Sequence, residues 1–171
     1  TLNSLEEALS RYSEFVRETK CRILANIWEE GVDGPRLVLV NRPEAIMRDS
    51  LIQHLQLVLR DANARPEHNT DETKPVDVRV EWFGSGAAAL IEVKWLGRST
   101  ARSRNPAPEP TYTDYGPPRA QQGADQLADY LDREARHTAS TATRGYLVVF
   151  DARRRNVGGA AEPLLEADAM Y

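Results

Sequence analysis

The amino-acid sequence predicts an α/β protein, an α+β arrangement in which helices flank a mixed sheet. Three observations predict this class. Amphipathic helical segments alternate along the chain with short segments of strand character, as in a layered fold. A segment that alternates polar and apolar side chains, 77–83, is followed by a glycine turn and a second, mainly apolar segment, 88–96, as in a β-hairpin. With 171 residues and a hydrophobic content of 41%, the chain is long and apolar enough to bury the core of one domain.

The first third of the chain is expected to be mainly helical. Apolar side chains recur at helical spacing between residues 2 and 30, which predicts one long helix or two short ones, ended by Gly31 and Gly34. Residues 36–40 form a short apolar run typical of a strand. A further helix is expected to begin with Pro43 in its first turn and to run to about Ala62.

The middle of the chain predicts a hairpin between two loops. Residues 77–83 and 88–96 are the expected strands, and Gly84, Ser85 and Gly86 form the turn. The polar segment 63–76 and the proline-rich segment 97–118 are expected to be loops.

The last elements are a helix and a strand. The helix is expected to follow Pro117 and Pro118 and to end near His137. The fully apolar run at 146–150 is typical of a strand that is buried on both faces.

The second hairpin strand carries two opposite charges among apolar residues. Side chains alternate along a strand, so Glu92 and Lys94 share one face while Ile91, Val93 and Trp95 pack on the other. Charges in such a strand are costly unless they are paired or bound. The chain holds only three lysines against 19 arginines, which makes a lysine at this position informative.

Two further carboxylates are expected near this pair. If the hairpin turns about Ser85 and Gly86, then Asp77 lies opposite Lys94 and Arg79 opposite Glu92, to within a residue or two of register. Glu44 falls on the apolar stripe of its helix, where it can offer a carboxylate to the sheet. The alternative is that Glu44 only favours the helix N-terminus.

These residues form a recognisable motif. The order Pro75-Val76-Asp77, hairpin, Glu92-Val93-Lys94 resembles the PD-(D/E)XK nuclease superfamily, whose fold is restriction-endonuclease-like. The resemblance covers residues 36–153, although Val76 separates the proline from the aspartate. Gln126 and Tyr130 look like the Gln-x-x-x-Tyr element of many family members, with Gln122 on the same helix face. An ordinary amphipathic helix is the alternative.

The resemblance implies a metal-dependent nuclease. It implies Mg²⁺ or Mn²⁺ bound by Asp77, Glu92, Glu44 and the backbone carbonyl of Val93, since hard cations prefer oxygen ligands. Lys94 would position the attacking water and stabilise charge in the transition state, and we favour this electrostatic role over that of a general base. The residues expected to contact nucleic acid or to support the site are Gln122, Gln126, Tyr130, Arg98 and Arg119.

DNA is the expected substrate in preference to RNA, and the chain is expected to act as the effector domain of a larger restriction, anti-phage defence or repair protein. One alternative is an inactive nucleic-acid-binding or assembly module that keeps the nuclease fold. Another is that the charged strand residues form a structural salt bridge. Dimerisation through the N-terminal helices, alone or within a larger complex, is a further hypothesis.

Charge divides the chain into three parts. The net charge of −4 argues against nucleic acid as a partner only if it is spread evenly. An N-terminal helical segment, 1–34, holds seven acids and four bases, and a C-terminal tail, 156–171, holds three acids and no base. The nuclease-like domain between them, 35–155, holds 18 bases and 16 acids. With a single cysteine and no apolar run long enough to span a bilayer, a cytoplasmic protein is expected.

Overall fold

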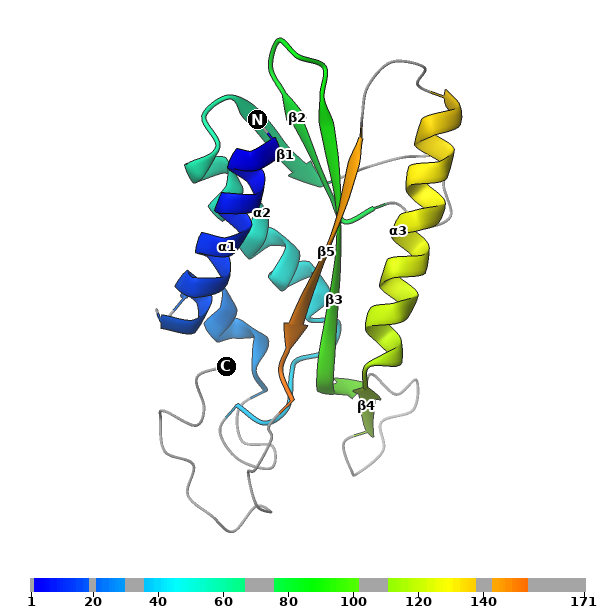
Figure 1. Ribbon diagram of the computed structural model, residues 1–171. Coiled ribbons are helices and arrows are strands. Elements are labelled where there is room, and N and C mark those ends of the chain that lie inside the picture. The colour runs from blue at the N-terminus through cyan, green and yellow to red at the C-terminus, as the bar shows by residue number, and fades with distance from the viewer. Residues whose placement is uncertain are drawn as a thin grey trace.

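A mixed sheet lies between two layers of helices (Figure 1). The computed structural model describes residues 2–18, 21–29, 36–66, 76–101, 111–137 and 143–153. Helices α1 and α2 cover one face of the sheet, and α3 covers the other (Figure 1). The predicted class, a mixed α/β sheet flanked by helices, is therefore confirmed.

Within the described residues the sheet has five strands, in the order β1-β2-β3-β4, with β5 paired to β3. Strand β3 is the longest and pairs with three of the others. The pairs β1–β2, β2–β3 and β3–β4 are antiparallel, whereas β5 runs parallel to β3 after the crossover through α3. The strand bounds are β1 Ala62–Pro66, β2 Val78–Trp82, β3 Ala88–Ala101, β4 Thr111–Tyr115 and β5 Arg144–Asp151.

The helices are α1 (Leu2–Glu18), a 3-10 helix η1 (Leu24–Ile27), α2 (Glu44–Val58) and α3 (Pro118–His137). Of the two arrangements left open for the N-terminal segment, the described residues show two separate helices. Helix α2 ends four residues before the expected Ala62.

The N-terminal helices share one hydrophobic core with the sheet. Leu5, Tyr12 and Leu24 are buried in the same cluster as Leu51 of α2 and Ile91 of β3. The apolar face of α1 is thus used within the chain, and dimerisation through the N-terminal helices stays a prediction.

Two strands lie where loops were expected. β1 consists of Ala-Asn-Ala-Arg-Pro, which lacks the β-branched and aromatic residues that mark strands, and it forms because Ala62 and Ala64 pack into the core. β4 falls within the proline-rich segment, although its alternating Thr and Tyr residues are a strand signal that could have revealed it. The prediction of loops over all of 63–76 and 97–118 was wrong.

The strand expected at 36–40 is also absent from the described residues. Only Leu39 makes bridges, one to Trp28 and one to Ser99. Arg36 and Arg42, at either end of this segment, have φ angles of 54° and 55°, in the left-handed region, so the chain turns on both sides of the short run. An apolar run therefore became a buried connection.

Strand β5 is not buried on both faces as predicted. Tyr146, Leu147, Val148 and Phe150 are half-buried, and Val149 is 37% exposed. Within the described residues β5 pairs only with β3, so it lies at an edge where α3 covers it only in part. Apolar composition alone does not distinguish a central strand from an edge strand of this kind.

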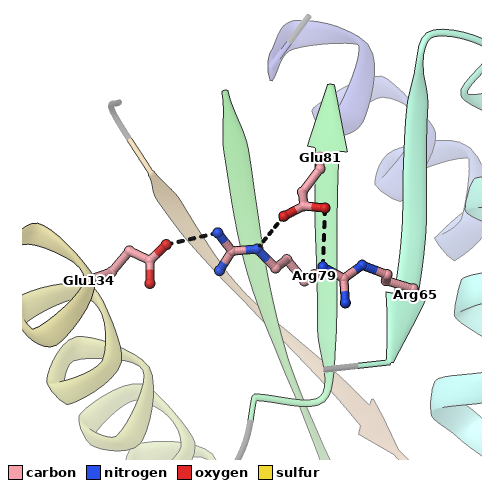
Figure 2. A network of polar contacts seen from close by, with 4 residues as sticks. All are labelled: Arg65, Arg79, Glu81 and Glu134. Atoms are coloured by element: carbon pink, nitrogen blue, oxygen red, sulfur yellow. Dashed lines mark hydrogen bonds and ion pairs between the residues drawn. The ribbon is translucent and has the colours of Figure 1, made fainter. Parts of the chain in front are cut away.

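An ion-pair network ties α3 to the sheet (Figure 2). Arg79 on β2 donates to Glu81, with Nε–Oε1 at 2.8 Å, and to Glu134 on α3, with Nη2–Oε1 at 2.8 Å. Arg65 on β1 completes the network through Glu81, at 3.1 Å. Arg79 is therefore held toward the C-terminal half of α3.

Among the described residues, no helix combines the length and the apolar character needed to cross a membrane.

Candidate functional site

The candidate site lies where β2 begins beside β3. Glu92 and Lys94 on β3 are buried, with 2% and 4% of their surface exposed, and the Lys94 ammonium donates directly to Glu92 Oε1. Both side chains face α3, whereas Ile91, Val93 and Trp95 join the core on the α2 side. The prediction that the two charges share one face is confirmed.

Asp77 lies beside this pair, but in a different register from the one predicted. The ladder pairs Val78 with Ile91 and Arg79 with Leu90, two residues away from the expected alignment. Continuing this register brings Asp77 opposite Glu92, and Asp77 Oδ2 accepts a hydrogen bond of 2.8 Å from the Val93 N–H. Asp77 is therefore not opposite Lys94, and Arg79 is not opposite Glu92. A slip of two residues keeps each side chain on its face, so the cluster forms nonetheless.

The surroundings disfavour the charged forms of both carboxylates. Burial raises the pKa of Asp77 above its ordinary value, and Glu44 raises it further, against the opposing effects of the Val93 N–H and Lys94. Burial also raises the pKa of Glu92, with Asp77 and Glu44 adding to the rise and Lys94 opposing it. These effects show that the three carboxylates are close enough to repel one another, which is typical of sites that bind a cation.

Glu44 enters this cluster from the first turn of α2 and is paired with Arg119. Arg119 Nη2 donates to Glu44 Oε1 at 2.9 Å, across 75 positions of sequence. The guanidinium also lies over the ring of Tyr115, with Cζ 4.6 Å from the ring centroid, and Tyr115 packs against the buried Trp95. The predicted Glu44 therefore shares the site with Arg119, and Tyr115 holds the arginine there.

Helix α3 packs closely over Lys94. A Cβ placed on Gly123 would lie 2.7 Å from Lys94 Cγ and 2.9 Å from Leu147 Cδ1, so only glycine allows this approach. Gln122 is exposed and Gln126 half-buried.

Tyr130 is buried two turns further along α3, in a cluster with Val76, the residue before Asp77. Its buried position favours a role in supporting the site over contact with a nucleic-acid strand.

Arg98 lies apart from the carboxylates. It is exposed on the C-terminal part of β3, pairs with Asp114 of β4 at 2.9 Å and lies over the ring of Tyr112. Arg102 and Arg104, which follow it in the sequence, lie outside the described residues.

In the part of the chain that the structure describes, no three His, Cys, Asp or Glu side chains are grouped closely enough to bind a metal ion as they stand. Each of the three carboxylates is instead engaged by a protein donor, namely Val93 N–H, Lys94 or Arg119. The donor set nevertheless fits a hard cation. Glu92 Oε2 is buried without a hydrogen-bond partner, and mutual repulsion among the carboxylates favours a positive charge between them.

Two residues of the site were not found from the sequence. Arg48 lies one helical turn after Glu44 and lowers the pKa of Asp77 by its charge. Tyr115 belongs to the unpredicted strand β4. The i, i+4 spacing of Glu44 and Arg48 was a signal for the first, whereas Tyr115 required the β3–β4 pairing to be known.

Substituting Asp77 by asparagine is expected to raise the melting temperature at pH 7 without metal by a few degrees. The folded protein favours the protonated form of Asp77, because its pKa is raised in the folded state. The stabilisation from this carboxyl is therefore fully present below its unfolded-state pKa of about 4. It is lost as the pH rises through the folded-state pKa. Asparagine keeps an acceptor for the Val93 N–H and removes the charge. Thermal unfolding followed by circular dichroism checks this, and the difference should vanish near pH 3. A lower melting temperature at pH 7 would contradict it.

Comparisons of the chain with family models, curated proteins and solved structures give no significant match.

Proposed function

We propose that the protein is a cytoplasmic, metal-dependent nuclease with a restriction-endonuclease-like core that hydrolyses phosphodiester bonds of DNA. The observation that carries the proposal is the cluster of the buried Glu92 and Lys94 with the half-buried Asp77, in which one glutamate oxygen has no hydrogen-bond partner within the described part of the chain. Buried charges of this kind lower stability, so their presence at one end of a strand pair favours a chemical role.

Asp77, Glu92 and Glu44 are the side chains that would hold Mg²⁺ or Mn²⁺, with the backbone carbonyl of Val93 as the further ligand that the motif implies. When bound, such a cation polarises a phosphoryl oxygen and increases the acidity of a bound water. Asp77 is fixed for this role by its bond to the Val93 N–H, which leaves its second oxygen available to a ligand. Glu92 Oε2 has no hydrogen-bond partner among the residues that the structure describes and is likewise available to a ligand.

Lys94 stabilises developing negative charge and orients the attacking water. Its position is set by Glu92, to which it donates, and by the close approach of Gly123, which confines the aliphatic part of its side chain. A fixed ammonium in a dry environment interacts with a transition state much more strongly than a hydrated one does.

The strand of nucleic acid is proposed to pass the N-terminal half of α3. Gln122, Gln126 and Arg119 lie there, and Arg98 lies on the neighbouring part of β3. Arginine is suited to this task because its planar fork binds phosphate oxygens in pairs. Tyr130 supports the helix from within the core.

The proposal is tested by incubating the purified protein with duplex DNA, single-stranded DNA and RNA, each with Mg²⁺, Mn²⁺ or EDTA. We expect cleavage of DNA that requires the divalent cation and is lost in Asp77→Asn, which preserves the fold. Cleavage that persists unchanged in EDTA or in Asp77→Asn would assign the activity elsewhere. Metal-independent binding of DNA without hydrolysis would favour the inactive binding module instead.

A further inference from the structure

The contact between Glu44 and Arg119 joins the first turn of α2 to the first turn of α3. It places a guanidinium against one of the three carboxylates that the proposed function assigns to the cation. Both side chains are partly exposed, at 34% for Glu44 and 25% for Arg119, so solvent and ligands can reach the pair.

Arg119 and a divalent cation would each supply positive charge beside the carboxylate of Glu44. Glu44 lies close enough to Asp77 and Glu92 for its negative charge to act on both, and its Oε1 is held by Arg119 at 2.9 Å. Any positive charge placed at Glu44 therefore stabilises the cluster. Arg119 supplies one positive charge there. A cation at Glu44 competes with this guanidinium, because Glu44 Oε1 already accepts a hydrogen bond of 2.9 Å from Arg119 and the two positive charges repel each other.

The guanidinium is anchored independently of Glu44. It lies over the ring of Tyr115, and Tyr115 is fixed by an edge contact with the buried Trp95, with ring centroids 4.7 Å apart. Loss of the bond to Glu44 would therefore leave Arg119 at the site.

Arg119 also has unused donors. Its Nε is buried with no hydrogen-bond partner among the described residues, and its Nη1 makes only a long contact of 3.5 Å with Gln122. A guanidinium has five N–H groups arranged to match the oxygens of a phosphate. The side chain can thus donate hydrogen bonds to an anionic oxygen while it remains over the ring of Tyr115.

We propose that Arg119 is a built-in counter-ion that holds Glu44 until a divalent cation binds, and that it then transfers its hydrogen bonds to a phosphate oxygen of the nucleic acid. The inference rests on the proposed nuclease function. Metal and phosphodiester binding are then coupled, since each favours the state in which the Glu44–Arg119 pair is open. By thermodynamic reciprocity, the nucleic acid tightens the metal site by the same factor as the metal tightens nucleic-acid binding.

The first test measures Mn²⁺ binding by isothermal titration calorimetry at pH 7 without nucleic acid. Arg119→Ala is expected to bind Mn²⁺ about tenfold more tightly than the wild type, within the usual range of coupling between sites. Arg133→Ala is the matched control, because it removes the same charge from an exposed position on the same helix and should change the affinity less than about twofold. Arg119→Gln replaces the alanine variant if that fails to fold.

The second test repeats the titrations with a saturating duplex DNA whose phosphorothioate linkages resist cleavage. The duplex should tighten Mn²⁺ binding by about tenfold in the wild type and by much less in Arg119→Ala. Equal Mn²⁺ affinities for wild type and Arg119→Ala, or a duplex effect that survives the substitution, would overturn the counter-ion role and leave the nuclease proposal standing. Failure of both proteins to bind Mn²⁺, or binding unaffected by Asp77→Asn, would overturn the metal site itself.

Discussion

Replacement of Lys94 by methionine is expected to reduce metal-dependent cleavage of DNA by about 10²–10³-fold, the usual loss when one preorganised group is removed from a transition state. Methionine nearly preserves the length and the apolar stem of the side chain, so packing against α3 changes little. What is lost is the ammonium that Glu92 holds in place.

Single-turnover cleavage with Mg²⁺ measures this effect, together with binding of the uncleaved duplex. Because the proposed role of Lys94 is in the transition state, the rate constant should fall while duplex affinity changes little. Lys94→Arg restores a positive charge with a different shape and should recover little activity. Full activity in Lys94→Met would remove this residue from the mechanism.

Gly123→Ala tests the position of Lys94 without removing its ammonium group. The added Cβ meets Lys94 Cγ at 2.7 Å, so the lysine has to shift. The overpacking cost of about 1–3 kcal/mol is offset in part by about 1 kcal/mol from the better helix propensity of alanine. We therefore expect a folded protein whose cleavage is at least about tenfold slower, which corresponds to a loss of about 1.4 kcal/mol of transition-state stabilisation. Unchanged activity would show that the position of Lys94 is not critical.

The second large effect concerns stability. Removing one partner of the buried Glu92–Lys94 pair, as in Glu92→Leu or Lys94→Met, is expected to lower the free energy of unfolding by about 3–5 kcal/mol, because the remaining group is left buried without its partner. The double variant Glu92→Leu/Lys94→Met should recover most of this loss, or exceed wild-type stability by about 1–4 kcal/mol, as apolar replacements of buried ion pairs often do.

The measurement is urea unfolding, at pH 7 without metal, of the wild type, the two single variants and the double variant, which together form a double-mutant cycle. Unchanged m values would show that the free energies are comparable. A coupling energy of several kcal/mol between the two sites is expected from their direct contact. If the losses in free energy of unfolding of the two single variants simply add in the double variant, Glu92 and Lys94 do not stabilise each other as an ion pair.

The two predictions together distinguish a structural salt bridge from a functional site. A pair whose joint removal leaves the protein stable but inactive is retained for its chemistry and not for folding. A pair whose joint removal lowers stability and leaves cleavage intact would support the structural alternative.

The parts of the fold with local, periodic patterns were predictable from the sequence. The hairpin strands, their glycine turn and α3 follow from alternation, from Gly84 and Gly86 at positive φ angles, and from a proline start. β1 was missed because it has no β-branched or aromatic residue, and β4 was missed because it lies in a proline-rich segment. Their pairing depends on the neighbouring strands rather than on their own composition.

The sequence by itself determined that Glu92 and Lys94 lie on the same face of an apolar strand, because the two-residue period of a strand requires it whatever the tertiary context. Only the tertiary structure decided that Asp77 lies beside Glu92 and that Arg119 pairs with Glu44. Hairpin register and contacts between distant helices are set by the packing of whole layers, and no periodicity within a single segment encodes them.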